Sequence, residues 1–233
     1  MIGLSAEDLL KYCPCFQPKV ETDVLFVGQT GVGKSTLINM IRHKDRPVVT
    51  AKVSNDAHPC TPHTTPYSMQ LGAGLHCQLW DTRGLDEAVD NRDRFMAKIV
   101  NKIRQLASQQ ERELKETIRS RTRMAKPILM WCIDAAKIDV PIHWQQFRKV
   151  YVEYCEERAI PVVIITRMPP KMDGWEPKCR NQLQQLGLGA AFGHTDVCLR
   201  RVRKHRSTSS PEYLEDGDAL RDLISQLMNQ ANF

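Results

Sequence analysis

At residues 28–35 the sequence reads G-Q-T-G-V-G-K-S. The apolar run D-V-L-F-V at residues 23–27 precedes this stretch, and S-T-L-I-N-M-I-R at residues 35–42 follows it with helical spacing. Glycines let the backbone bend closely around an anion, and the N-terminus of the following helix adds a favourable dipole. The pattern G-x-x-x-x-G-K-[ST] between a strand and a helix therefore predicts a phosphate-binding loop; the alternative is a plain Gly-rich turn.

The predicted loop assigns roles to its residues. We expect the amides of residues 31–34 to point inward, Lys34 to reach the β and γ phosphates, and Ser35 to offer its hydroxyl to Mg²⁺. The residues of this stretch expected to bind the cofactor are Gly28, Thr30, Gly31, Val32, Gly33, Lys34, Ser35 and Thr36.

A second motif supports the first. Residues 75–84 read L-H-C-Q-L-W-D-T-R-G, an apolar strand that ends in D-x-x-G. Asp81 can hold Mg²⁺ through water, and the amide of Gly84 can sense a γ-phosphate. In the loop at 58–67, Thr65 is the best candidate to close on Mg²⁺ and the γ-phosphate, with Thr64 and Thr61 as alternatives. The predicted catalytic residues are thus Lys34, Thr65 and Gly84, and the predicted metal ligands are Ser35, Thr65 and Asp81.

Strand-like and helix-like stretches alternate along the chain. Apolar runs predict strands at residues 23–27, 66–71, 75–81, 127–134, 161–166 and 197–202, and helical patterns lie at 35–42, 144–159, 176–186 and 218–230. A Gly72-Ala73-Gly74 turn predicts a hairpin between the second and third strands. The alternation predicts an α/β fold with a mostly parallel sheet, one antiparallel edge strand and helices on both faces. Residues 89–126, polar and nearly free of Gly and Pro, are expected to form one long helix or two.

Composition places the chain among ordinary globular proteins. It has 233 residues, a formal net charge of +6, 26% charged residues and 42% hydrophobic residues, which excludes disordered and collagen-like classes. No stretch approaches the ~20 apolar residues of a membrane span, so we expect no transmembrane segment. The eight cysteines are irregularly spread and form no C-x-x-C pair, which favours a reducing compartment and a cytoplasmic location.

The order of the motifs resembles the translation-factor-related class of P-loop GTPases. T-L-I-N at residues 36–39 is similar to the septin, Era-like and AIG1-like groups, and P-I-L-M-W-C-I-D-A at 127–135 followed by P-V-V-I-I-T at 161–166 resembles fungal G-domain proteins. The resemblance implies a three-layer P-loop NTPase fold with GTP or GDP and Mg²⁺ as cofactors. It also implies a G domain at residues 20–233, behind an N-terminal extension at 1–19.

The base-binding part departs from that family, whose [NT]-K-x-D motif reads guanine through its Asp. Here the strand ends T-R-M-P at residues 166–169. The resemblance implies that Thr166 and Arg167 take part in the base site, with the stem of Arg167 stacked on the base. Pro169 cannot replace the Asp, whereas Asp173, in P-K-M-D at 170–173, supplies a carboxylate from a shifted loop. Three possibilities stay open: guanine is read by residues 166–169, it is read by residues 170–173, or the chain does not read guanine.

Hydrolysis and partners give a second set of expectations. Leu85 follows Gly84 where a water-positioning Gln is usual, so we expect slow hydrolysis. A homodimer or an effector protein, contacting the switch region and the helix at 89–126, can supply the missing group. Basic runs at 112–126 and 200–206 are either solvated faces or a site for an anionic partner.

Three functions fit these residues. The first is a guanine-nucleotide-binding switch protein with slow, Mg²⁺-dependent GTP hydrolysis. The second is a degenerate G domain that serves as a scaffold, with or without nucleotide. The third is an ATP-using enzyme, which would need an Arg-bearing lid and an acceptor pocket that the sequence does not indicate.

Overall fold

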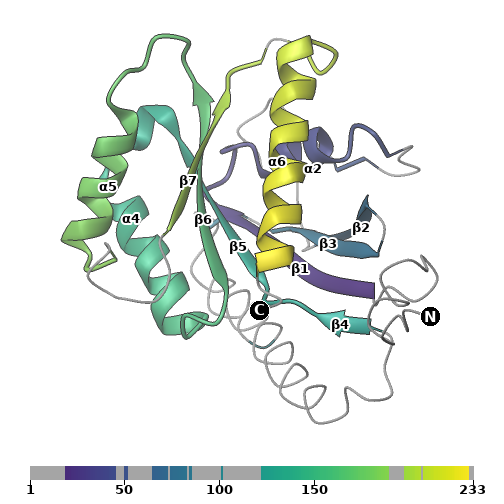
Figure 1. The fold of residues 1–233 in the computed structure, drawn as a ribbon. Coiled ribbons are helices and arrows are strands. Elements are labelled where there is room, and N and C mark those ends of the chain that lie inside the picture. The colour runs from purple at the N-terminus through teal and green to yellow at the C-terminus, as the bar shows by residue number, and fades with distance from the viewer. Residues whose placement is uncertain are drawn as a thin grey trace, which may run out of the picture.

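The computed structural model describes residues 19–45, 50–51, 65–72, 74–82, 84–85, 101, 122–188, 197–205 and 207–230. Within these ranges strands and helices alternate as the sequence predicts (Figure 1). The strands are β1 (Lys19–Gly28), β2 (Thr65–Gly72), β3 (Leu75–Asp81), β4 (Thr122–Met124), β5 (Ile128–Asp134), β6 (Ile160–Met168) and β7 (Cys198–Arg203). The helices are α2 (Lys34–Ile41), α4 (Pro141–Arg148), α5 (Trp175–Gln185) and α6 (Pro211–Gln230), with a 3-10 turn at Ala135–Lys137 and a π-helix at Lys149–Tyr154.

The described strands form one sheet in the order β2-β3-β1-β5-β6-β7, with β4 beside β1. β2 pairs with β3 in the antiparallel direction, as the predicted hairpin requires, and the other pairs are parallel. The prediction of a mostly parallel sheet with one antiparallel edge strand is therefore confirmed. Because the central strands run parallel, their carboxyl ends meet at one edge of the sheet, where the loops after β1, β3, β5 and β6 lie.

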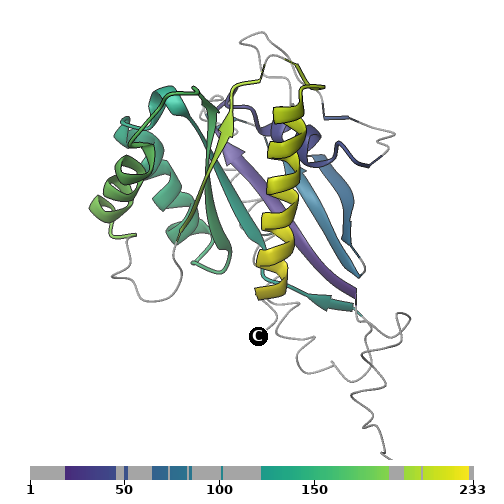
Figure 2. The same ribbon diagram turned by 45° about the horizontal axis from the view of Figure 1, so that its top comes forward.

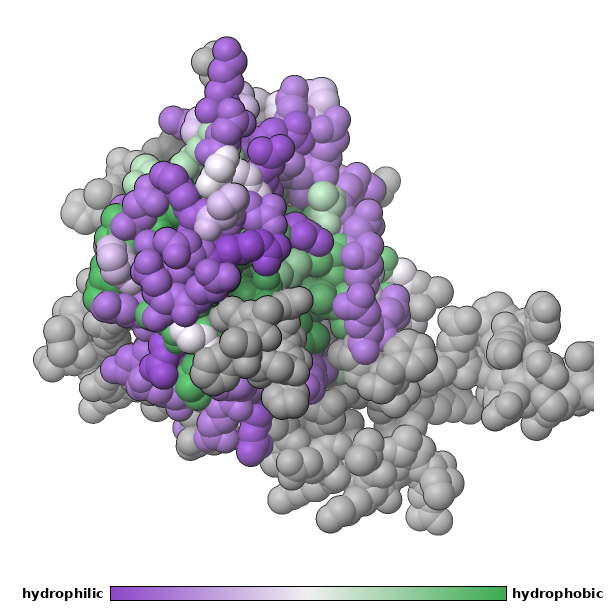
Figure 3. All heavy atoms as spheres, turned by 60° about the vertical axis from the view of Figure 1, so that its left-hand side comes forward, coloured by the Kyte–Doolittle hydropathy of each residue, from purple (hydrophilic) through white to green (hydrophobic). Residues whose placement is uncertain are grey.

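Side chains of the central strands alternate between two hydrophobic cores, one on each face of the sheet. In β1, Val24 and Phe26 join the core that α2 and α6 cover, whereas Leu25 and Val27 join the core that α4 covers. Figures 1 and 2 show α2 and α6 on one face and α4 and α5 on the other. On the side of α4 and α5, hydrophilic residues make up most of the coloured surface, with hydrophobic residues between them (Figure 3). The three-layer arrangement is confirmed.

One prediction is wrong in part. The helical segment expected at 89–126 lies almost entirely outside the described residues, but its C-terminal end is the strand β4 and not a helix. β5 pairs with β1 only from Val24 onward, which leaves the first residues of β1 with a free edge. β4 fills this edge, pairing Lys19 with Thr122, and the Oγ1 of Thr22 donates to the carbonyl of Lys126 at 2.8 Å where the ladder is interrupted. The backbone N–H and C=O groups at the free edge of β1 need hydrogen-bond partners, and they therefore favour a strand where the sequence period predicted a helix.

Two helices differ from their expected bounds. The helix expected at 144–159 begins at Pro141 and passes into the π-helix at Lys149–Tyr154. The helix expected at 218–230 begins at Pro211, and Gly217 in its interior faces the carbonyl of Met40 in α2. Proline suits the first turn of a helix because its missing N–H would have no partner there.

Candidate functional site

The phosphate-loop sequence forms a tight turn between β1 and α2. Gly31 and Gly33 have φ angles of 73° and 99°, in the left-handed region that favours glycine. The Nζ atom of Lys34 donates to the carbonyls of Gly28 at 3.1 Å and Gln29 at 2.9 Å. Lys34 is only 6% exposed, so its charge is held inside the loop. The arrangement concentrates positive potential at the start of α2.

Two of the three predicted Mg²⁺ ligands meet: Ser35 in the first turn of α2 and Asp81 at the end of β3. The Oγ atom of Ser35 donates to Oδ2 of Asp81 at 2.7 Å, and Asp81 is 1% exposed. Thr65 lies opposite Asp81 in the register of β2 and β3. Hydroxyl and carboxylate oxygens are what Mg²⁺ prefers, and it commonly takes one or two protein ligands with phosphates and water filling its shell. The donor set therefore fits Mg²⁺ held together with a polyphosphate, and among the described residues no group of three His, Cys, Asp or Glu forms a metal site of its own.

Asp81 also affects its surroundings electrostatically. Burial raises the pKa of Tyr67 on β2, and the negative charge of Asp81 raises it further. Both effects disfavour the phenolate, so Tyr67 stays neutral beside the carboxylate at physiological pH.

The segment after β3 lies directly against the phosphate loop. The hydroxyl of Thr82 donates to the carbonyl of Phe26, and the amide of Leu85 donates to the carbonyl of Gly28 at 3.3 Å. A Cβ atom built on Gly84 would stand 2.5 Å from the backbone nitrogen of Thr30, so only glycine fits this approach. The side chain of Leu85 is 4% exposed and belongs to the core on the α4 side.

The end of β6 holds the phosphate loop from another direction. Oγ1 of Thr166 donates to the carbonyls of Val32 at 2.9 Å and Ile133 at 3.2 Å. The guanidinium of Arg167 donates through Nη2 to the carbonyl of Gly31 and through Nη1 to Oδ2 of Asp134, the latter at 2.8 Å. Two residues predicted for the base site therefore contact the backbone of the loop.

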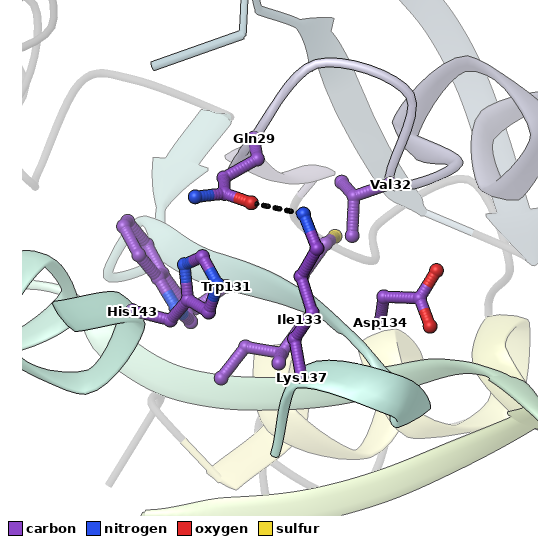
Figure 4. Close-up of a pocket in the computed structure, with 8 residues that line it drawn as sticks. Gln29, Val32, Trp131, Ile133, Asp134, Lys137 and His143 are labelled. Carbon is purple, nitrogen blue, oxygen red and sulfur yellow. Dashed lines mark hydrogen bonds between the residues drawn. The ribbon is translucent and has the colours of Figure 1, made fainter. Parts of the chain in front are cut away.

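A small pocket lies between the phosphate loop and the end of β5 (Figure 4). It is lined by Gln29, Val32, Trp131, Cys132, Ile133, Asp134, Lys137 and His143. Nζ of Lys137 donates to Oε1 of Gln29 at 2.8 Å, which ties the turn after β5 to the loop. Nε1 of Trp131 is buried with no hydrogen-bond partner among the described residues. Burial raises the pKa of the Cys132 thiol to about 12, so this side chain acts as a small apolar group.

Other predicted residues lie farther from these contacts. Thr36 is in α2, where its carbonyl accepts from the hydroxyl of Tyr213 at 3.5 Å. Asp173 is exposed in the turn between β6 and α5. Thr61 and Thr64 lie outside the described residues.

Sequence reasoning missed Asp134 and the pair Gln29–Lys137. The signal available for Asp134 was its position as a charged residue at the end of an apolar run, because the carboxyl ends of parallel strands meet at one edge of a sheet.

The basic runs are only partly described. At 200–206, Arg200, Arg201 and Lys204 are exposed, whereas Arg203 pairs with Asp216 of α6 at 2.9 Å and His205 contacts the same carboxylate at 2.9 Å. Most of the run at 112–126 lies outside the described residues. None of the described helices has the length and apolar character needed to cross a bilayer.

Comparisons with known proteins agree with this geometry. Two solved structures share the fold, each at 15% identity and each matching 91% of this chain. One is a dimerization-deficient mutant of Toc33 from Arabidopsis thaliana, which is covered over 84% of its length with a TM-score of 0.53. The other is Era in complex with MgGDPNP and a fragment of 16S ribosomal RNA, which is covered over 57% of its length with a TM-score of 0.50. A search of curated proteins gives no match. The family model described as 50S ribosome-binding GTPase matches residues 23–168, more than half of the chain. With the strand–loop–helix at residues 19–41 and the carboxylate of Asp81 beside it, this match shows that the chain belongs to that GTPase family.

Proposed function

We propose that this protein is a guanine-nucleotide-binding switch that hydrolyses GTP slowly with Mg²⁺. The observation that carries the proposal is the convergence of Lys34, Ser35 and Asp81 at the carboxyl ends of β1 and β3. A buried ammonium group, a hydroxyl and a buried carboxylate at one helix N-terminus form a site for a polyphosphate with its divalent cation.

The residues divide the work as follows. Lys34 neutralises the β and γ phosphates, and the amides of residues 31–34 bind their oxygens. Ser35 and Thr65 would hold Mg²⁺ with their hydroxyls, and Asp81 would hold it through a water. When bound, Mg²⁺ neutralises charge that develops on the phosphate oxygens. The amide of Gly84 would bind the γ-phosphate and so couple its presence to the conformation of the segment that follows.

Slow turnover follows from Leu85. A residue that orients the attacking water must reach into the site, but Leu85 packs its side chain into the core on the α4 side. A group that completes the site would then come from a second copy of the chain or from an effector bound at the switch region and residues 89–126. A nucleotide-binding scaffold without turnover is the second candidate, and the burial of Leu85 favours it as well.

The nucleotide base would lie near Thr166 and Arg167, with Asp173 as the carboxylate that reads guanine. We place the G domain at residues 20–233 and the protein in the cytoplasm, because the eight cysteines are irregularly spread and form no C-x-x-C pair. We also propose that an anionic partner binds at Arg200, Arg201 and Lys204.

The direct test is nucleotide binding by Lys34→Ala. Calorimetric titration with GTP, GDP and ATP is expected to give tight, Mg²⁺-dependent binding of guanine nucleotides to the unchanged protein and no measurable binding to the variant. Lys44→Ala is the matched control, because Lys44 is an exposed lysine after α2 that pairs with Asp218. Unchanged affinity in Lys34→Ala, with circular dichroism showing a folded protein, would refute the site. Single-turnover hydrolysis then separates the switch from the scaffold.

A further inference from the structure

Two neighbouring carbonyls of the phosphate loop are held by side chains from the end of β6. Thr166 bonds to the carbonyl of Val32 and Arg167 to the carbonyl of Gly31. In a trans peptide the C=O and the next N–H point in opposite directions. Fixing the Gly31 carbonyl toward β6 therefore directs the amide of Val32 away from β6. The Val32 amide indeed turns into the loop, where it makes a long bond of 3.4 Å to the carbonyl of Gln29.

The position of Arg167 is set in turn by Asp134. Thr166 and Asp134 are register partners in β6 and β5, so Arg167 emerges beside the end of β5. The carboxylate of Asp134 is bound on both oxygens: Oδ2 accepts from Nη1 of Arg167 at 2.8 Å and Oδ1 accepts from the amide of Ala136 at 2.9 Å. Asp134 is the more buried partner, because its side chain is 16% exposed against 52% for Arg167. The carboxylate of Asp134 thus orients the half-exposed guanidinium of Arg167 toward the loop.

We propose that Asp134 is a positioning residue that presets the phosphate loop through Arg167. The inference rests on the proposed nucleotide-binding function and extends it to a residue outside the loop. With Arg167 anchored, the peptide between Gly31 and Val32 is oriented before the ligand arrives, so less ordering entropy is lost on binding. The effect concerns the polyphosphate and not the base.

Asp134→Asn tests the idea with little structural change. The amide oxygen of Asn can still accept from Ala136, so the 3-10 turn keeps its cap while the ion pair with Arg167 loses its charge. Asp139→Asn is the control, because Asp139 forms an ion pair of similar length with Lys178, at 2.8 Å, on the exposed side of the next turn. Affinities are measured by displacing fluorescent GTP with GTP and with inorganic tripolyphosphate, both with Mg²⁺.

For Asp134→Asn we expect affinities for GTP and for tripolyphosphate to fall by the same factor, about three- to tenfold, with no change in Asp139→Asn. Arg167→Ala should give a similar loss of tripolyphosphate affinity, and adding Asp134→Asn to it should cost nothing more for that ligand, since the carboxylate acts through the guanidinium. Unchanged tripolyphosphate affinity, or a loss confined to GTP, would overturn the proposal, because Arg167 would then act on the nucleoside.

A second measurement needs no ligand. Amide hydrogen exchange of the nucleotide-free protein is expected to be faster at residues 31–34 in Asp134→Asn than in the unchanged protein and in Asp139→Asn. Equal exchange in all three proteins would overturn the inference even if nucleotide binding is confirmed. Absence of nucleotide binding in the unchanged protein would instead refute the proposed function, and the exchange result still decides the role of Asp134 in shaping the loop.

Discussion

Gly84→Ala is expected to reduce the preference of the protein for GTP over GDP. An ideal Cβ at this position would lie 2.5 Å from the backbone nitrogen of Thr30 and 2.6 Å from its Cα, whereas ordinary contacts are 3.4–4 Å. The two segments must therefore separate by about 1 Å. The phosphate loop cannot easily give way, because the carbonyls of Gly28 and Gln29 are bonded to Lys34.

The size of this separation sets the expected loss of GTP affinity. Moving the Gly84 amide outward by about 1 Å would break the hydrogen bond to the γ-phosphate that we propose, and a bond to a charged group contributes about 1.5–3 kcal/mol. Affinity for a non-hydrolysable GTP analogue should thus fall by about 10- to 150-fold, while GDP, which has no γ-phosphate, loses less than about threefold.

Competition against a fluorescent guanine nucleotide measures both affinities. Gly72→Ala is the control, because a Cβ there meets no atom within 4 Å. An unchanged ratio of GTP to GDP affinity, or an equal fall in both, would show that Gly84 does not sense the γ-phosphate.

Three further changes have expected outcomes. Leu85→Gln should lower the free energy of unfolding by about 2–4 kcal/mol in urea titrations and leave single-turnover hydrolysis within about twofold, because the amide would enter a core position that is 4% exposed. A gain in hydrolysis would contradict the burial argument. Gly217→Ala should destabilise the fold by about 1–3 kcal/mol in the same assay despite the better helix propensity of alanine, since the new Cβ would collide with the carbonyl of Met40 and approach Nδ1 of His43 to 3.0 Å. Burial raises the pKa of Cys77, Cys132 and Cys155 to about 12, above about 8.5 for an unfolded thiol, so each contributes stability that is complete below pH 8.5 and lost as pH rises towards 12. Unfolding free energies should therefore fall by about 1 kcal/mol per thiol between pH 8.5 and 9.5, and Cys132→Ala should remove one such step.

The strands predicted best are those bounded by Gly or Pro in the sequence. The run at 75–81 matches β3 (Leu75–Asp81), and the run at 127–134 differs from β5 (Ile128–Asp134) by its initial proline. β4 could not be found in this way, because three residues in a polar stretch carry no period. The strand exists because β1 has a free edge before Val24, and that is a property of the assembled sheet.

The start of α6 was missed although the sequence signals it. Ser210 precedes Pro211, and its Oγ accepts from the amide of Tyr213 at 3.2 Å, which is the bond of a helix cap. The apolar period alone favoured a start at 218, because Gly217 lowers the apparent helical propensity. Gly217 is there for a packing reason, the close approach of α6 to the carbonyl of Met40.

For the candidate site, motif spacing identified residues that the structure brings together but not the contacts that shape the site. Each phosphate motif is local in the sequence, but Ser35 and Asp81 meet only because β1 and β3 are neighbours in the sheet. Contacts such as Gly84 against Thr30 and Arg167 against Asp134 join segments more than 30 residues apart. They depend on strand order and register, which the sequence pattern does not specify.

The residues T-R-M-P at 166–169 divide between holding the phosphate loop and the proposed base site. Thr166 and Arg167 bond to the carbonyls of Val32 and Gly31, so these two residues hold the phosphate loop. The position at which the family motif carries its base-reading Asp is changed, because Pro169 has no carboxylate. Neither of the loop-holding bonds involves a base, and Asp134, which anchors Arg167, has both oxygens occupied by protein donors. We therefore expect the affinity of the loop for a polyphosphate to be set independently of how the base is chosen, so that a change in base preference need not weaken it.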